Sequence, residues 1–150
     1  AVALGTARAC LDAFCGLAGA KTPRSMDAAL RDQPVIQATV GRSEAQLRSA
    51  RAFLFESVRD IWSEAVSTGA ISSNRRAILR LATTHAIRLA VDVVDSVYHA
   101  CGVTVIFEGN PIQRYFQDIH VISQHTQARL AHYESIGKHA LGLKVDQARF

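Results

Sequence analysis

The stretch of this sequence best suited to chemistry runs from residue 110 to residue 125 and is rich in amides and imidazoles. It opens with asparagine and proline, a pair that caps and starts helices. Four polar side chains recur at three- or four-residue spacing and so share one face of the expected helix: Gln113, Gln117, His120 and Gln124. His125 points about 140° away from His120, so the two rings are poorly placed to hold one metal ion. The residues alone leave open whether this polar face is solvated or lines a site.

Motifs that would assign another chemistry are missing from the sequence. It contains no nucleophile elbow, no P-loop and no dinucleotide-binding glycine pattern. Cys10, Cys15 and Cys101 lack the spacing of a metal site, and we expect them to be reduced thiols. His85 lies among apolar residues and is expected in the core or in an interface, whereas His99 closes a helix, where a cation favours the dipole. We therefore predict no metal site.

The bulk composition places the chain in the ordinary globular class. It has 150 residues, 49% of them hydrophobic and 20% charged, with a net charge of +4. The basic residues are scattered, which argues against a nucleic-acid partner. We find no apolar run near the roughly 20 residues of a membrane span and no signal-peptide pattern, and we expect a cytoplasmic protein without a membrane partner. The chain does not begin with methionine, so we expect a fragment or a processed chain.

Hydrophobic periodicity predicts an all-α fold, an antiparallel four-helix bundle. The helices are expected at about residues 3–20, 34–67, 73–101 and 111–136. Residues 21–33 read as an exposed crossover, and residues 103–107 as a buried connector. The bundle then forms one domain over residues 1–142, followed by a tail over residues 143–150.

Two faces of these helices carry further expectations. Three aromatic residues of the second helix are interpreted as core packing: Phe53, Phe55 and Trp62. Four residues of the third helix step by four and are expected to face solvent: Arg80, Thr84, Arg88 and Asp92. Such long helices with wide apolar faces often pack against a second subunit.

Three segments resemble the C-terminal helical domain of acyl-CoA dehydrogenase-like proteins. They are residues 4–14, residues 97–102, and residues 111–120 followed by His125. The resemblance implies that this chain is the third domain of a longer protein, preceded by a helical domain and a β-domain. It also implies a homo-oligomer, usually a tetramer, whose core the bundles form. By the same resemblance, this domain alone is predicted to be inactive.

The absence of one residue that many members of that superfamily carry favours a particular branch of it. Many dehydrogenases of the family carry a glutamate base shortly after the aspartate that matches Asp118, but residues 124–127 read Gln-His-Thr-Gln here. The sequence is more similar to the flavin-dependent monooxygenases, such as dibenzothiophene monooxygenase and the oxygenase components of phenol-type hydroxylases. That branch implies reduced flavin, FMN or FAD, from a separate flavin reductase, together with O2 and a small-molecule substrate, aromatic or related.

The resemblance also assigns roles to individual residues. His125 is the first candidate catalytic residue and His120 the second, because a histidine can hydrogen-bond a phenolic substrate or tune protonation at the flavin. Tyr98, His99 and Gly102 fall where the family's third helix approaches flavin, often that of a neighbouring subunit. The family usually has arginine before the aspartate, where this chain has Gln117.

Two alternatives remain open at this point. One is an FAD-dependent acyl-CoA dehydrogenase whose base lies outside residues 124–127. The other is a bundle that only oligomerises and binds no flavin.

Overall fold

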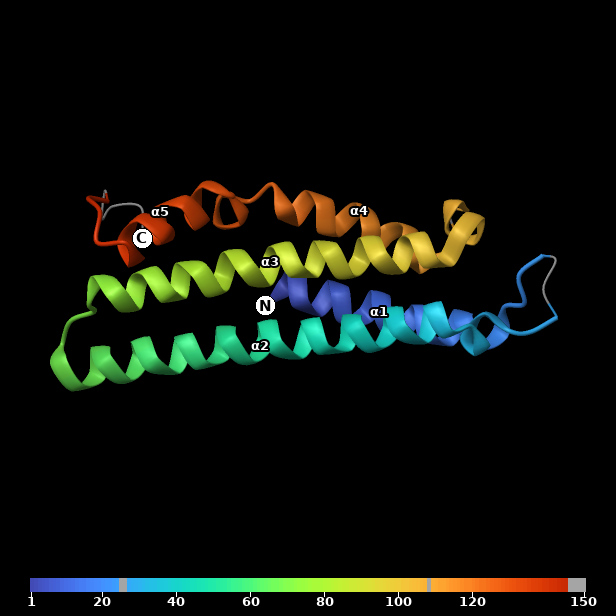
Figure 1. The fold of residues 1–150 in the computed structure, drawn as a ribbon, viewed down its shortest axis with the longest axis horizontal. Helices are drawn as coiled ribbons and strands as arrows, with labels where there is room; N and C mark the ends of the chain where they lie inside the picture. The colour runs from blue at the N-terminus through green and yellow to red at the C-terminus, as the bar shows by residue number, and fades with distance from the viewer. Residues whose placement is uncertain (25–26, 108, 146–150) are drawn as a thin grey trace.

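The computed structural model describes residues 1–24, 27–107 and 109–145, and within these ranges it contains helices and no strands. Three long helices form the body of the bundle: α1 (Val2–Ala20), α2 (Pro34–Thr68) and α3 (Ser73–Cys101). Two shorter ones, α4 (Pro111–Ser123) and α5 (Ala131–Ala140), follow each other along one side of α3 (Figure 1). The predicted all-α bundle is therefore confirmed. Residues 25 and 26 of the expected crossover and residues 146–150 of the expected tail lie outside the described residues.

The helix ends follow the local signals in the sequence. Gly69 ends α2 in the left-handed conformation at φ 71°, where a residue without Cβ is not strained. Ser72 caps α3 through its side chain, and Asn110 does the same for α4, with Pro111 in its first turn. Three short 3-10 helices connect the long ones: η1 (Leu30–Asp32), η2 (Gly102–Ile106) and η3 (Thr126–Ala128).

The expectation of one last helix running to residue 136 is wrong. Helix α4 ends at Ser123, and His125 has extended backbone torsions, φ −62° and ψ 144°. The Nδ1 atom of His125 accepts a hydrogen bond from the backbone N–H of Gln127, so the side chain caps η3 instead of continuing α4. A new helix, α5, then begins at Ala131 and passes through Gly137 without ending there. The angle between the two histidine rings that a continuous helix implies therefore does not apply.

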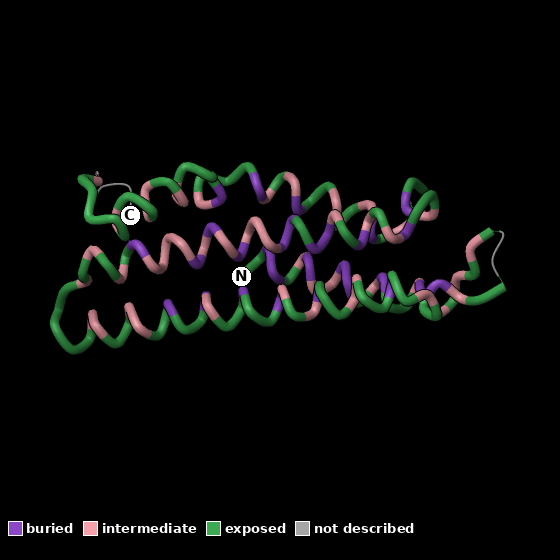
Figure 2. The backbone as a smooth tube through the Cα atoms, viewed as in Figure 1, coloured by how far each residue is buried: buried purple, intermediate pink, exposed green. Residues whose placement is uncertain are grey.

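The core lies where α1, α3 and α4 meet. Its largest fully buried side chains include Phe14, Leu11, Ile112, Ile119 and Val94. Figure 2 shows that buried residues cluster along this part of the bundle and thin out toward the end where α2 turns into α3. Because α1 begins beside the middle of α2, it covers only part of the α2–α3 pair (Figure 1).

Two faces differ from expectation: part of α2 lies beyond the cover of α1, and one face of α3 is covered by the segment after α4. Phe53 packs against the core as predicted, but Phe55 and Trp62 are 50% and 71% exposed. On α3, Thr84 is fully buried, and Arg80 and Arg88 are only partly exposed, because the segment after α4 packs on that face. The expectations of aromatic core packing on α2 and of a solvent face on α3 are therefore wrong at these positions.

The connector after α3 is also only partly as expected. Val105 is fully buried, whereas Val103, Ile106 and Phe107 are each more than half exposed. One turn of 3-10 helix directs a single side chain of the run into the core, so the apolar run as a whole is not a buried segment.

Two helical segments, Val2–Ala20 and Ser73–Ile106, are long and apolar enough to cross a membrane by length and composition alone. The expectation that no segment meets that measure does not hold for them. Both segments pack against other helices in this bundle, and core helices of this kind meet the same measure.

Candidate functional site

The turn after α4 is held in place by side chains from α3. The Thr84 hydroxyl donates to the backbone carbonyl of Gln127 at 2.8 Å, and Arg88 Nε donates to the carbonyl of Ala128 at 2.7 Å. Arg80 adds a hydrogen bond to the side-chain oxygen of Gln127. Since Thr84 is fully buried, its bond is made away from water and ties the turn firmly to α3. These contacts fix the position of η3 and, with it, that of His125.

His125 borders a mostly apolar pocket of about 580 Å³. The start of α1 and residues from α2, α3 and α4 supply the walls, with Leu4, Leu54, Ala86, Ile87 and Ile122 among them. Gln127 also lines this pocket, and none of the described residues that line it is a carboxylate. A pocket of this size and character suits a small apolar or aromatic molecule.

The hydrogen bonding of His125 determines which ring nitrogen is available. Its Nδ1 accepts the Gln127 N–H at 3.2 Å, so a neutral ring carries its proton on Nε2. In that tautomer Nε2 can donate a hydrogen bond to an oxygen atom of a bound molecule. The hydrogen bond within the turn thus fixes the orientation of the ring and makes Nε2 the donor nitrogen.

His120, the second candidate, lies in a different place. Its Nε2 is 3.0 Å from Asp95 Oδ1 across the seam between α3 and α4, and its ring meets the face of Phe116 edge-on. Phe116 stacks in turn on Tyr98, with ring centroids 4.1 Å apart, and the Tyr98 hydroxyl donates to Gln113. His120 does not line the pocket that His125 borders. The structure therefore places the two candidate histidines in separate environments.

The three residues expected to approach flavin are not gathered in one cavity. Tyr98 packs toward α4, whereas His99 borders a hollow of about 400 Å³ between the start of α2 and the end of α3. Gly102 has φ 58° and ψ −149°, a conformation that residues with a Cβ rarely adopt. Beside it, Lys21 Nζ donates to the carbonyl of Cys101 at 2.6 Å and so satisfies the end of α3.

The hollow beside His99 contains two residues that the sequence reasoning missed. Arg42 lines it, and Ser43 is 1% exposed with a hydroxyl that has no hydrogen-bond partner among the described residues. Leaving a buried hydroxyl unpaired costs about 1–3 kcal/mol, so a group from outside this chain that reached it would be favoured. The available signal was Ser43, a polar residue in the apolar register of Ile36, Val40 and Leu47. An arginine, a histidine and an unpaired hydroxyl fit an anionic or strongly polar ligand group.

The buried cysteines are unsuited to nucleophilic chemistry. Burial raises the pKa of Cys10 to about 12 and that of Cys101 to about 11, so both remain protonated near neutral pH. They act as small apolar residues between α1 and α3.

Comparison with known proteins adds an independent line of information. Residues 1–130 match the family described as acyl-CoA dehydrogenase, C-terminal domain. The chain is 36% identical over 136 residues to indole-3-acetate monooxygenase of Pseudomonas putida. The aligned residues make up 91% of this chain and 35% of that protein. The chain is 27% identical over 143 residues to the protein of the same name from Acinetobacter baumannii, covering 95% and 37%.

Solved structures show the same fold at lower identity. XiaF from Streptomyces sp., in complex with FADH2 and glycerol, superposes with a TM-score of 0.87 at 20% identity, covering 95% of this chain and 37% of that one. The HsaA monooxygenase from M. tuberculosis gives 0.84 at 22% identity, covering 97% and 38%. This chain therefore spans little more than a third of the length of these relatives.

Proposed function

Because this chain belongs to the acyl-CoA dehydrogenase C-terminal domain family, we propose that it is the helical part of a flavin-dependent monooxygenase. The full-length protein would insert one oxygen atom from O2 into a small aromatic or related substrate. Two similar proteins are indole-3-acetate monooxygenases, and a structural neighbour was solved with FADH2. Reduced flavin, when bound, supplies the electrons that activate O2.

The observation that carries this proposal is the setting of His125. It borders an apolar pocket whose described lining contains no carboxylate, and its Nδ1 is engaged by the backbone of η3. A dehydrogenase that removes an α-proton needs a base at the substrate carbon, and this pocket offers no Asp or Glu for that role. A neutral imidazole with Nε2 available can instead orient a polar group of the substrate. His125 is therefore our candidate catalytic residue, ahead of His120, whose Nε2 is engaged by Asp95.

For the cofactor we propose the end of α3 and the hollow beside it. His99, Arg42 and Ser43 would hold a polar, anionic part of FMN or FAD, since the hollow contains a guanidinium and an unpaired buried hydroxyl. The glycine conformation at Gly102 would let a ligand approach the backbone closely, and Tyr98 would support that end of α3 through its stack on Phe116.

We also propose a homo-oligomer, most simply a tetramer, served by a separate flavin reductase in the cytoplasm. The exposed apolar residues of α2 support a second copy as the partner. Val58, Trp62 and Val66 are 45% to 71% exposed and recur at helical spacing.

The test uses the full-length protein supplied with reduced FMN or FAD, indole-3-acetate and isotopically labelled O2. The expected result is a product that carries one labelled oxygen atom. Desaturation of an acyl-CoA with an artificial electron acceptor, without any oxygenated product, would instead establish the dehydrogenase. Absence of both reactions and of flavin binding would favour a bundle that only oligomerises.

A further inference from the structure

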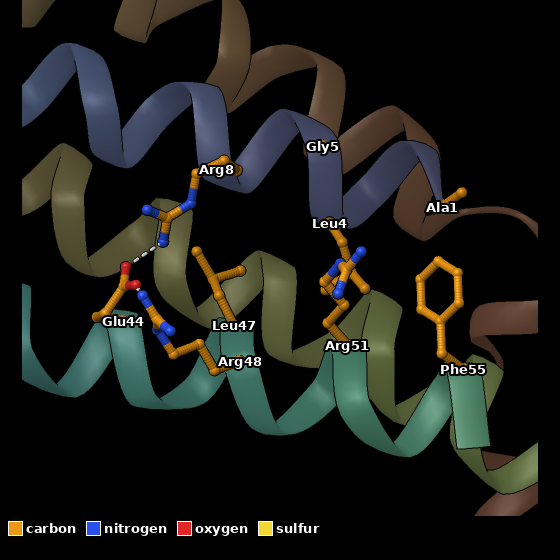
Figure 3. A pocket seen from close by; sticks show the side chains of 9 residues that line it. All are labelled: Ala1, Leu4, Gly5, Arg8, Glu44, Leu47, Arg48, Arg51 and Phe55. Carbon is orange, nitrogen blue, oxygen red and sulfur yellow. Dashed lines mark hydrogen bonds and ion pairs between the residues drawn. The ribbon is translucent and has the colours of Figure 1, made fainter. Parts of the chain in front are cut away.

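A groove between the start of α1 and the middle of α2 combines an apolar floor with several guanidinium groups (Figure 3). Its volume is about 530 Å³. The floor is formed by Leu4, Leu47 and Phe55, and Phe55 is half exposed there. Four charged residues complete the lining: Arg8, Glu44, Arg48 and Arg51. The groove therefore carries three positive groups against one negative group.

The ion pairs within the groove leave one of these positive groups uncompensated. Arg48 Nε lies 2.6 Å from Glu44 Oε1, and Arg8 pairs with Oε2 of the same carboxylate. Arg8 also reaches Asp12 Oδ1 at 3.3 Å. The hydrogen bonds from Arg8 and Arg48 lower the pKa of Glu44, so this carboxylate stays ionised. Both of its oxygens are thus occupied.

Arg51 is the guanidinium without a carboxylate partner among the described residues. Its Cζ atom lies over the ring of Phe55, 4.6 Å from the centroid. Figure 3 shows its side chain in the centre of the groove, between the Glu44 cluster and Phe55. A cation on an aromatic face still has its in-plane N–H donors available for an acceptor. Arg48 uses only Nε toward Glu44, so its terminal nitrogens are available as well.

We propose that this groove binds a small aromatic carboxylate. Arg51 holds the carboxylate with its planar pair of donors, assisted by Arg48, and the ring rests on Leu4, Leu47 and Phe55. The geometry suits a carboxylate better than a phosphate, because one guanidinium is unpaired and the remaining floor is apolar.

The groove lies next to the pocket that His125 borders. Ala1 and Leu4 line both the groove and the pocket that His125 borders, so the two cavities adjoin at the start of α1. This step rests on the proposed function, because it identifies the substrate class as aromatic acids. Arg51 is then the residue that distinguishes an acid from its neutral analogue.

The test measures binding and requires no turnover. Full-length protein without flavin is titrated calorimetrically with indole-3-acetate and with the neutral indole-3-acetamide. We expect the wild type to prefer the acid and Arg51→Met to bind the acid roughly tenfold or more weakly, because one charge-assisted hydrogen-bonded pair is lost. The affinity for the amide should not change. Arg51→Lys should retain part of the preference for the acid, which separates loss of charge from misfolding.

Arg59→Met is the matched control, since Arg59 is exposed on the same helix and lies outside the groove. Equal affinity for acid and amide, or equal effects of Arg51→Met and Arg59→Met, would overturn the proposal. If Arg51-dependent binding persists and no oxygenated product forms with any flavin, the proposed function fails and the binding site stands. If product forms and Arg51→Met binds the acid as tightly as the wild type, the proposed binding site fails and the proposed function stands.

Discussion

Two histidines near the end of α4 lie five residues apart in the chain but in contrasting surroundings. His120 is on the helix, paired with Asp95 and packed against Phe116 in the seam between α3 and α4. His125 is past the helix end, in a turn seated on α3, and borders an apolar pocket. The first ring has a carboxylate partner at Nε2, whereas the second accepts a hydrogen bond at Nδ1 from the backbone N–H of Gln127.

The difference shows how a helix break changes what a side chain can do. On a continuous helix both rings would project from the helix surface, and the nitrogens of each ring would face either solvent or a neighbouring helix. The break at Gln124 turns the chain, so that the backbone itself takes one ring nitrogen of His125 and leaves the other for a ligand. A site built in this way depends on how firmly the turn is held.

The largest effect is expected from His125→Ala in the full-length protein. If Nε2 of this ring hydrogen-bonds the substrate, the rate of product formation should fall by roughly 10²–10³-fold, the effect of removing one positioned donor. Product and hydrogen peroxide are measured together, because uncoupled flavin oxidation should continue. An oxygenation rate within twofold of wild type would remove His125 from the catalytic machinery.

A smaller effect is expected from Thr84→Val, which weakens the attachment of the turn to α3. The substitution keeps the shape but removes the hydrogen bond to the Gln127 carbonyl, which should lower the free energy of unfolding by about 1–2 kcal/mol. Product formation should fall several-fold, because His125 is no longer fixed. The measurements are chemical denaturation and the same product assay.

Thr84→Ser serves as the control, since it retains the hydroxyl and should restore most of the coupling between flavin oxidation and product. If Thr84→Val changed stability and left product formation at the wild-type level, the turn would not control the position of His125.

The smallest effect is expected from Asp95→Asn in the other region. The pair it forms with His120 is partly exposed, with side-chain accessibilities of 36% and 41%, so its loss should cost no more than about 1 kcal/mol. Product formation should stay within about threefold of wild type, as measured in the same assay. A loss as large as that of His125→Ala would show that the seam, and not the turn, contains the reacting group.

Local signals explain why much of the fold was predictable. Asn110 and Pro111 mark the start of α4, and Gly69 marks the end of α2, because capping and left-handed turns are decided by a few adjacent residues. The three- and four-residue spacing of apolar residues in α1 and α3 likewise agrees with which of them are buried, Phe14 and Val97 among them.

The remaining features depend on contacts between distant residues. The break after Ser123 is stabilised by Thr84, which lies 43 positions before its partner Gln127. The exposure of Trp62 depends on how far α1 extends along α2, which periodicity within α2 cannot indicate. His99, Arg42 and Ser43 line one hollow only because α2 and α3 lie side by side.

The sequence by itself determined that this protein is an all-helical bundle and singled out His125, which it placed on the last helix. Only the tertiary structure decided that this histidine leaves the helix, borders an apolar pocket and has one ring nitrogen engaged. The physical reason is that helix formation and capping depend on neighbouring residues. The seating of a turn depends instead on a buried hydroxyl and a guanidinium supplied by a distant helix.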